Sequence, residues 1–143
     1  MKPFLLLTIR AEDAAADNEY ESFLAGAGLA ERDLRRHRLE QRPLGGSDLR
    51  DWSGVLLGGG PFNTSDREER KSPAQQRAEA NLRGLLDKVT GADFPFLGAC
   101  YGIGILGSHQ GAVVDRRYAE PVGAVAVTLT REGVGSITPA VVP

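Results

Sequence analysis

The residue best suited to covalent chemistry is the single cysteine of the chain, Cys100. It lies in the segment Gly98-Ala-Cys-Tyr-Gly102, after the apolar run 94–97 and before a stretch, 103–110, that is typical of a helix. A strand, a Gly-x-Cys-x-Gly turn and a helix in this order predict a nucleophile elbow, where the reacting side chain sits on a sharp turn. Gly98 and Gly102 fit this interpretation because side chains there would collide with the turn.

An elbow would place the sulfur of Cys100 at the N-terminus of the following helix. Backbone N–H groups and the helix dipole favour a thiolate at that position. The backbone N–H of Tyr101 would then point toward an oxyanion that develops during attack on a carbonyl. The alternative is a buried structural cysteine, the commoner role of an isolated one. The strand, the paired glycines and the helix together favour the nucleophile.

A second glycine-rich turn follows another apolar run, in the segment Gly54-Val-Leu-Leu-Gly-Gly-Gly-Pro61. Such a turn can present a backbone N–H to the edge of a sheet where α/β proteins place their sites. We expect Gly59 or Gly60 to supply the second oxyanion donor, and the sequence does not choose between them. On its own the segment is more typical of a plain tight turn. It is not a phosphate loop, because no Gly-Lys-Ser/Thr follows.

The elements that must position these two turns alternate between strands and helices. This alternation predicts a single α/β domain with a mainly parallel sheet over residues 1–143. Ser72 is expected to cap the longest helix, with Pro73 in its first turn and Gln75 as a capping-box partner. The predicted strands cover 4–9, 38–41, 54–57, 94–97 and 122–130, and the predicted helices lie around 20–27, from 72 to 91, and over 103–110.

Composition excludes several classes of function. The 143 residues carry a net charge of −2, which gives no reason to expect nucleic acid as a partner. One cysteine forms no internal disulfide and no cysteine-rich zinc site, and two distant histidines argue against a metal. The apolar run near the N-terminus is too short to span a membrane or to match a signal peptide. The expected setting is cytoplasmic, with no membrane partner.

Three stretches together resemble the class I, triad-type glutamine amidotransferases, and most closely the glutaminase portion of GMP synthase. They are GVLLGGGP at 54–61, FPFLGACYGIG at 94–104 and AEPVGAVAVTLTRE at 119–132. The resemblance covers about residues 3–132. It implies an open α/β sheet with helices on both faces, and a reaction that uses glutamine as substrate and needs no cofactor.

The resemblance also implies roles for the residues of both turns. Cys100 would attack the side-chain amide carbon of glutamine, ammonia would leave, and water would hydrolyse the glutamyl thioester. The N–H of Tyr101 and that of Gly59 or Gly60 would form the oxyanion hole. No synthetase domain is attached. The resemblance therefore implies either a synthetase partner that accepts the ammonia or release of the ammonia.

Two departures from the family pattern lead us to expect weak or absent glutaminase activity. Gly104 stands where the family usually has a glutamine, four residues after the cysteine. The late His-x-Glu motif, which completes the catalytic triad, does not occur after Cys100, so we expect a domain incomplete at its C-terminal end. Neither histidine replaces it: His109 would lie on the opposite side of the helix and about 13 Å along it. His37 belongs to a basic run that is typical of a solvated surface.

Two alternatives stay open. One is an elbow-cysteine hydrolase of the intracellular-protease and deglycase superfamily, which shares the sheet and the elbow. The other is a non-catalytic binding or assembly module on the same scaffold, because an incomplete sheet exposes edge and core surface that favours association.

Overall fold

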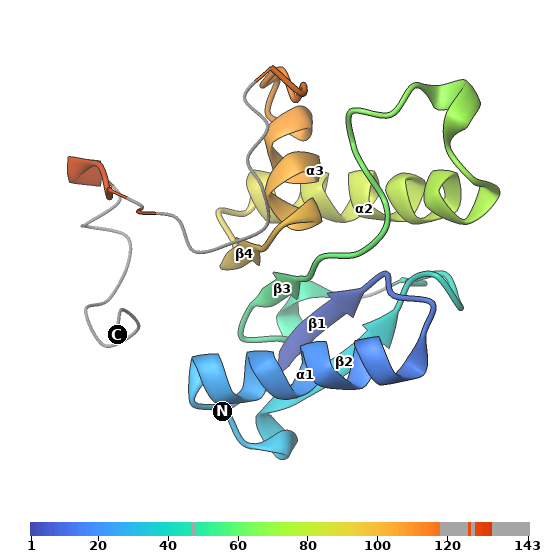
Figure 1. The fold of residues 1–143 in the computed structure, drawn as a ribbon. Helices are drawn as coiled ribbons and strands as arrows, with labels where there is room; N and C mark the ends of the chain where they lie inside the picture. The colour runs from blue at the N-terminus through green and yellow to red at the C-terminus, as the bar shows by residue number, and fades with distance from the viewer. Residues whose placement is uncertain (47, 118–125, 127, 133–143) are drawn as a thin grey trace.

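The computed structural model describes residues 1–46, 48–117, 126 and 128–132. Its core is a sheet of four parallel strands in the order β2-β1-β3-β4, which confirms the predicted α/β fold (Figure 1). The strands are β1 (Phe4–Thr8), β2 (Leu34–Arg38), β3 (Val55–Leu57) and β4 (Phe96–Gly98); the helices are α1 (Asp13–Ala27), α2 (Pro73–Gly91) and α3 (Tyr101–His109); short 3-10 turns cover Glu31–Asp33, Leu49–Asp51 and Glu68–Arg70.

The central strand β1 is apolar throughout because helices cover both faces of the sheet. Leu5 and Leu7 belong to the cluster that α2 closes, and Leu6 points the other way into the cluster that α1 closes. Figure 1 shows α1 on one side of the sheet and α2 on the other. A strand buried on both faces has no polar side to alternate with, which explains the unbroken apolar run.

The second strand differs from the prediction. We expected it over 38–41, whereas β2 covers Leu34–Arg38 and pairs with β1 from Leu34 opposite Phe4. Only Leu34 of this edge strand is fully buried, so the apolar signal is too weak to set the register. Its basic side chains contact α1 instead, where Arg36 Nη1 lies 2.7 Å from Asp17 Oδ1.

Helix α2 begins and ends where the sequence predicts. The Ser72 hydroxyl accepts a hydrogen bond from the Gln75 N–H at 3.1 Å, and Pro73 opens the helix. The capping box is not completed, because the Gln75 side chain donates to Glu79 Oε1 at 2.9 Å. A buried carboxylate at Glu79 takes the amide that would otherwise turn back to the cap.

The predicted strand 122–130 lies mostly outside the described residues. Within it, residues 126 and 128–130 have no regular secondary structure. In the described part of the chain, no helix is long and apolar enough to cross a bilayer.

Replacing Leu7 by alanine should lower the free energy of unfolding by about 2–5 kcal/mol, because this side chain is fully buried at the centre of the sheet. Urea denaturation measures the change. Leu97→Ala is the matched control, since Leu97 is 58% exposed. Equal losses in the two variants would show that the core does not lie beneath β1.

Candidate functional site

Cys100 lies on the turn between β4 and α3, at the carboxyl edge of the sheet. Its backbone has φ 54° and ψ −107°, a conformation that residues with side chains rarely adopt. Such strain costs about 1–3 kcal/mol and persists where the surrounding structure enforces it. Here the Ala99 N–H donates to Leu57 O at 2.9 Å and the Gly102 N–H donates to Ala99 O at 2.9 Å. The Cys100 side chain is left exposed at the tip of the turn.

The two glycines that flank the turn are required by backbone packing. A Cβ on Gly98 would lie 2.5 Å from the carbonyl carbon and oxygen of Gly102. A Cβ on Gly102 would lie 2.6 Å from the carbonyl oxygen of Leu57 on β3. Neither distance is compatible with a side chain, so α3 can approach β3 and β4 only through glycines.

The glycine turn after β3 packs directly against Cys100. A Cβ on Gly59 would lie 3.2 Å from the Cys100 sulfur, and one on Gly60 would lie 2.6 Å from Ile9 Cγ1. Parallel pairing explains the proximity, because Leu57 on β3 is in register with Gly98 on β4. The residues of both predicted turns therefore meet at one edge of the sheet.

The amides near the sulfur differ in whether they are already bonded. The Gly59 N–H donates to Glu19 Oε1 at 2.9 Å. The N–H groups of Gly60 and Tyr101 donate to no acceptor among the described residues. At the start of α3, a free N–H is what helix geometry leaves.

Helix α3 is anchored by the buried side chain of Tyr101. Its hydroxyl lies 3.4 Å from Glu79 Oε1, and its ring packs edge-on against Phe62 with centroids 6.1 Å apart. Burial, with the negative charge of Glu79, raises the pKa of Tyr101 well above its ordinary value. The other oxygen of Glu79 accepts from Lys71 Nζ at 2.7 Å. These contacts hold the first turn of α3, and so the turn that carries Cys100, against α2.

Neither of the two histidines contacts Cys100. His109 ends α3, where its Nε2 lies 2.8 Å from Asp87 Oδ1 on α2. His37 lies on the far edge strand β2, with its Nε2 3.2 Å from the carbonyl oxygen of Arg42. Burial lowers the pKa of His37 below its ordinary value. No group of metal-ligating side chains occurs in the described part of the chain.

The space beside Gly104 is filled by another side chain. A Cβ on Gly104 would lie 2.6 Å from Thr64 Oγ1, so a glutamine at this position would require Thr64 to move.

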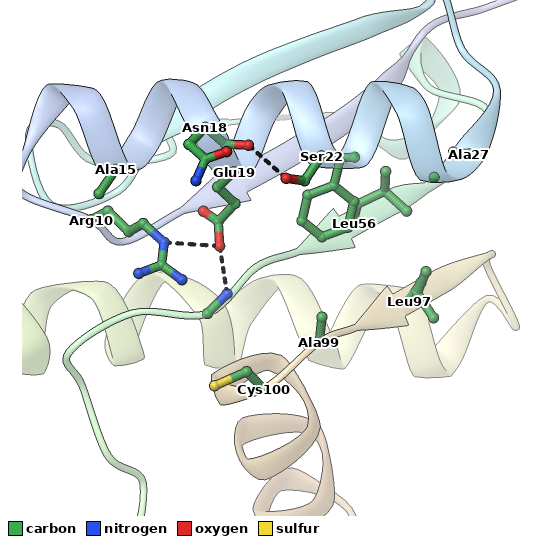
Figure 2. Close-up of a pocket in the computed structure, with 13 residues that line it drawn as sticks. Arg10, Ala15, Asn18, Glu19, Ser22, Ala27, Leu56, Leu97, Ala99 and Cys100 are labelled. Carbon is green, nitrogen blue, oxygen red and sulfur yellow. Dashed lines mark hydrogen bonds and ion pairs between the residues drawn. The ribbon is translucent and has the colours of Figure 1, made fainter. Parts of the chain in front are cut away.

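A cavity of about 630 Å³ opens beside Cys100, between α1 and the ends of β3 and β4 (Figure 2). Phe23, Leu56 and Leu97 supply apolar walls, and Arg10 and Glu19 supply the charged end near the elbow. The cavity exists because α1 covers β3 but leaves Leu97 on β4 exposed.

Arg10 and Glu19 line the cavity beside Cys100, and the sequence did not predict either of them there. Arg10 directly follows the first apolar run, and Glu19 is an ordinary polar position beside the apolar stripe of α1. The apolar pattern of α1 does not predict that the helix face carrying Glu19 contacts the glycine turn after β3.

The comparisons with known proteins support the fold. No family model matches the sequence, and no curated protein matches it. Among solved structures, the chain is similar to the crystal structure of a glutamine amido transferase from Methylobacillus flagellatus, with 23% sequence identity and a TM-score of 0.54. The similarity covers 78% of this chain and 39% of the other chain, so this chain spans well under half of the length of the similar protein. The parallel sheet with its flanking helices is the shared feature.

Replacing Gly98 by alanine should destabilise the protein by about 1–3 kcal/mol, because the new Cβ overlaps the backbone of Gly102. Urea denaturation again measures the change. Gly84→Ala is the matched control: Gly84 lies in α2 with open space around it, and alanine there should stabilise by about 0.5–1 kcal/mol. A gain of stability in both variants would contradict the close contact between Gly98 and Gly102.

Replacing Glu79 by alanine should cost about 1–3 kcal/mol, because it removes the acceptor of the buried Tyr101 hydroxyl and of the Gln75 amide. Lys71 keeps its ion pair with Glu68. Thermal and urea unfolding give the magnitude. Glu69→Ala, at an exposed position nearby, should change stability by less than about 0.5 kcal/mol. A loss below about 1 kcal/mol for Glu79→Ala would contradict the anchoring of Tyr101 through this carboxylate.

Proposed function

We propose that this chain forms the glutamine-acylation part of a class I glutamine amidotransferase site of the GMP synthase glutaminase type. The observation that carries the proposal is the strained backbone of Cys100, held at the end of β4 with the glycine turn of β3 packed against its sulfur. Strain of this kind clusters at catalytic positions. The fold shared with a glutamine amidotransferase structure supports glutamine as the substrate.

The proposed reaction begins when the Cys100 sulfur attacks the side-chain amide carbon of glutamine. The carbon–sulfur bond forms, and the carbonyl electrons move to the oxygen, which becomes an oxyanion. Collapse of this intermediate breaks the carbon–nitrogen bond, and ammonia leaves with the proton that the thiol supplied. Water then hydrolyses the glutamyl thioester to glutamate and regenerates the thiol.

The oxyanion donors in this proposal are the backbone N–H groups of Gly60 and Tyr101. Both belong to the turns beside the sulfur, and both lack an acceptor among the described residues. The Gly59 N–H, the other candidate from the sequence, already donates to Glu19. Preorganised N–H donors contribute most when they need no rearrangement, which favours Gly60 over Gly59.

Turnover by this chain alone should be slow. Both half-reactions benefit from a positioned base, and the two histidines of the chain lie at Asp87 and Arg42 rather than at Cys100. We therefore propose an acylation site that reacts with glutamine-like electrophiles but releases little ammonia. A synthetase partner that accepts the ammonia belongs to the same proposal.

The test is covalent labelling of the purified chain by the chloroketone analogue of glutamine, located by peptide mass mapping. We expect selective modification of Cys100, at least about tenfold faster than by a chloroketone without the amino-acid group, because the site would hold the analogue near the sulfur. Excess glutamine should slow the reaction. Ammonia release from glutamine should stay close to the rate of the Cys100→Ala variant.

The same experiment separates the alternatives. Equal rates with both chloroketones and no protection by glutamine would contradict a glutamine site. That result would favour a hydrolase with another substrate, or a binding module whose cysteine is merely exposed. Rapid ammonia release that disappears in Cys100→Ala would contradict the expected slow turnover.

A further inference from the structure

A carboxylate from α1 reaches the glycine turn from the side opposite the nucleophile. Glu19 Oε1 accepts the Gly59 N–H at 2.9 Å and lies 3.2 Å from Arg10 Nε. In Figure 2 the Glu19 carboxylate and the Cys100 side chain lie on opposite sides of the backbone nitrogen that the dashed line marks. The hydrogen bond from Gly59 to Glu19 therefore holds the glycine turn without involving the Cys100 sulfur.

The side chain of Glu19 is unusual for a helix surface, since only 9% of it is exposed. Burying an ionised carboxylate is costly unless it is paired and hydrogen-bonded. Here the compensation is modest: the N–H at Arg10 Nε is not aimed at the carboxylate, and Glu19 Oε2 has no hydrogen-bond partner among the described residues. A small apolar residue would pack at this position at lower cost, which indicates a role beyond packing.

A second feature of the turn accommodates the same contact. A Cβ on Gly58 would lie 2.5 Å from Glu19 Oε1, so the carboxylate occupies the space in which a side chain at 58 would stand. Gly58 is thus needed for the approach of Glu19, as Gly59 is for the approach of Cys100. The three consecutive glycines have separate roles, one on each side of the turn and one against Ile9.

We propose that Glu19 is a positioning residue for the oxyanion turn: by accepting the Gly59 N–H, it fixes the following peptide so that the Gly60 N–H is free to face Cys100. The inference rests on the proposed function, because it assigns a task to a turn that matters only if an oxyanion forms there. Arg10 supplies the opposite charge beside this carboxylate, with its Nε 3.2 Å from Glu19 Oε1. The Arg10 carbonyl oxygen is itself held by Arg38 Nη2 at 2.8 Å.

The test measures the stability of a tetrahedral adduct and does not require turnover. Glutarate semialdehyde has the five-carbon skeleton of glutamine, with an aldehyde in place of the side-chain amide and no amino group, and it forms a reversible hemithioacetal with a thiol. The sulfur–carbon bond forms, and the carbonyl oxygen takes the thiol proton and occupies the oxyanion position. Its Kd is measured for the wild type, Glu19→Leu and Glu19→Gln. Alkylation of Cys100 by iodoacetamide, which forms no oxyanion, serves as the control for thiol reactivity.

Glu19→Leu should raise the Kd of the aldehyde about tenfold, because the turn loses its acceptor, while the iodoacetamide rate changes less than about twofold. Glu19→Gln should keep the Kd within about threefold of the wild type, since its amide oxygen can still accept the Gly59 N–H. Gly58→Ala should act in the same direction as the leucine variant, by displacing the carboxylate. If the leucine variant does not fold, Glu19→Asp replaces it, because a carboxylate one methylene shorter also leaves Gly59.

Three results would overturn the inference. The first is an unchanged Kd in the variant that loses the acceptor. The second is a parallel fall in aldehyde binding and iodoacetamide alkylation, which would mean that the whole elbow has shifted. The third is a glutamine variant as weak as the leucine variant, which would show that charge matters and not the hydrogen bond. Failure of the proposed function is seen separately, as unselective chloroketone labelling of the wild-type chain.

Discussion

The structure around the Cys100 sulfur depends on backbone-to-backbone packing between the ends of β3 and β4 and the first turn of α3. Two backbone contacts at this edge leave no room for a Cβ: Gly98 against Gly102, and Gly102 against Leu57. At these distances the relative positions of the two turns are set by main-chain atoms, which have little freedom to adjust. The strained backbone of Cys100 follows from this packing, because the chain must turn from β4 into α3 within two residues, Ala99 and Cys100.

The helices contribute to the site from both faces of the sheet. On one face, α2 holds the first turn of α3 through the Glu79 carboxylate, which is also bonded to Lys71 and Gln75. On the other face, α1 places Glu19 against the Gly59 amide. Both contacts use a buried carboxylate, a group whose burial is costly without partners. The two carboxylates lie next to the two turns that would bind an oxyanion.

The sequence predicts the parts of this fold that depend on local patterns. The apolar run of β1, the Ser72 cap of α2 and the Gly-x-Cys-x-Gly turn each carry their own signal, and the α/β order follows from them. The predicted position of β2 is wrong because the strand is basic. Its side chains are paired with residues of α1 that lie far away in the sequence, and a local pattern does not record such contacts. Glu19 and Gly59 are 40 residues apart, and neither residue belongs to a sequence pattern that indicates their contact, so it could not be predicted.

The most direct test is a crystal structure of the chain with glutarate semialdehyde bound to Cys100. We predict a hemithioacetal whose oxygen lies about 3 Å from the backbone nitrogens of Gly60 and Tyr101, while the Gly59 N–H still donates to Glu19. An oxygen bound to the Gly59 N–H after release of Glu19, or an oxygen turned to solvent away from both turns, would contradict the central claim that these turns form a preorganised site for an oxyanion.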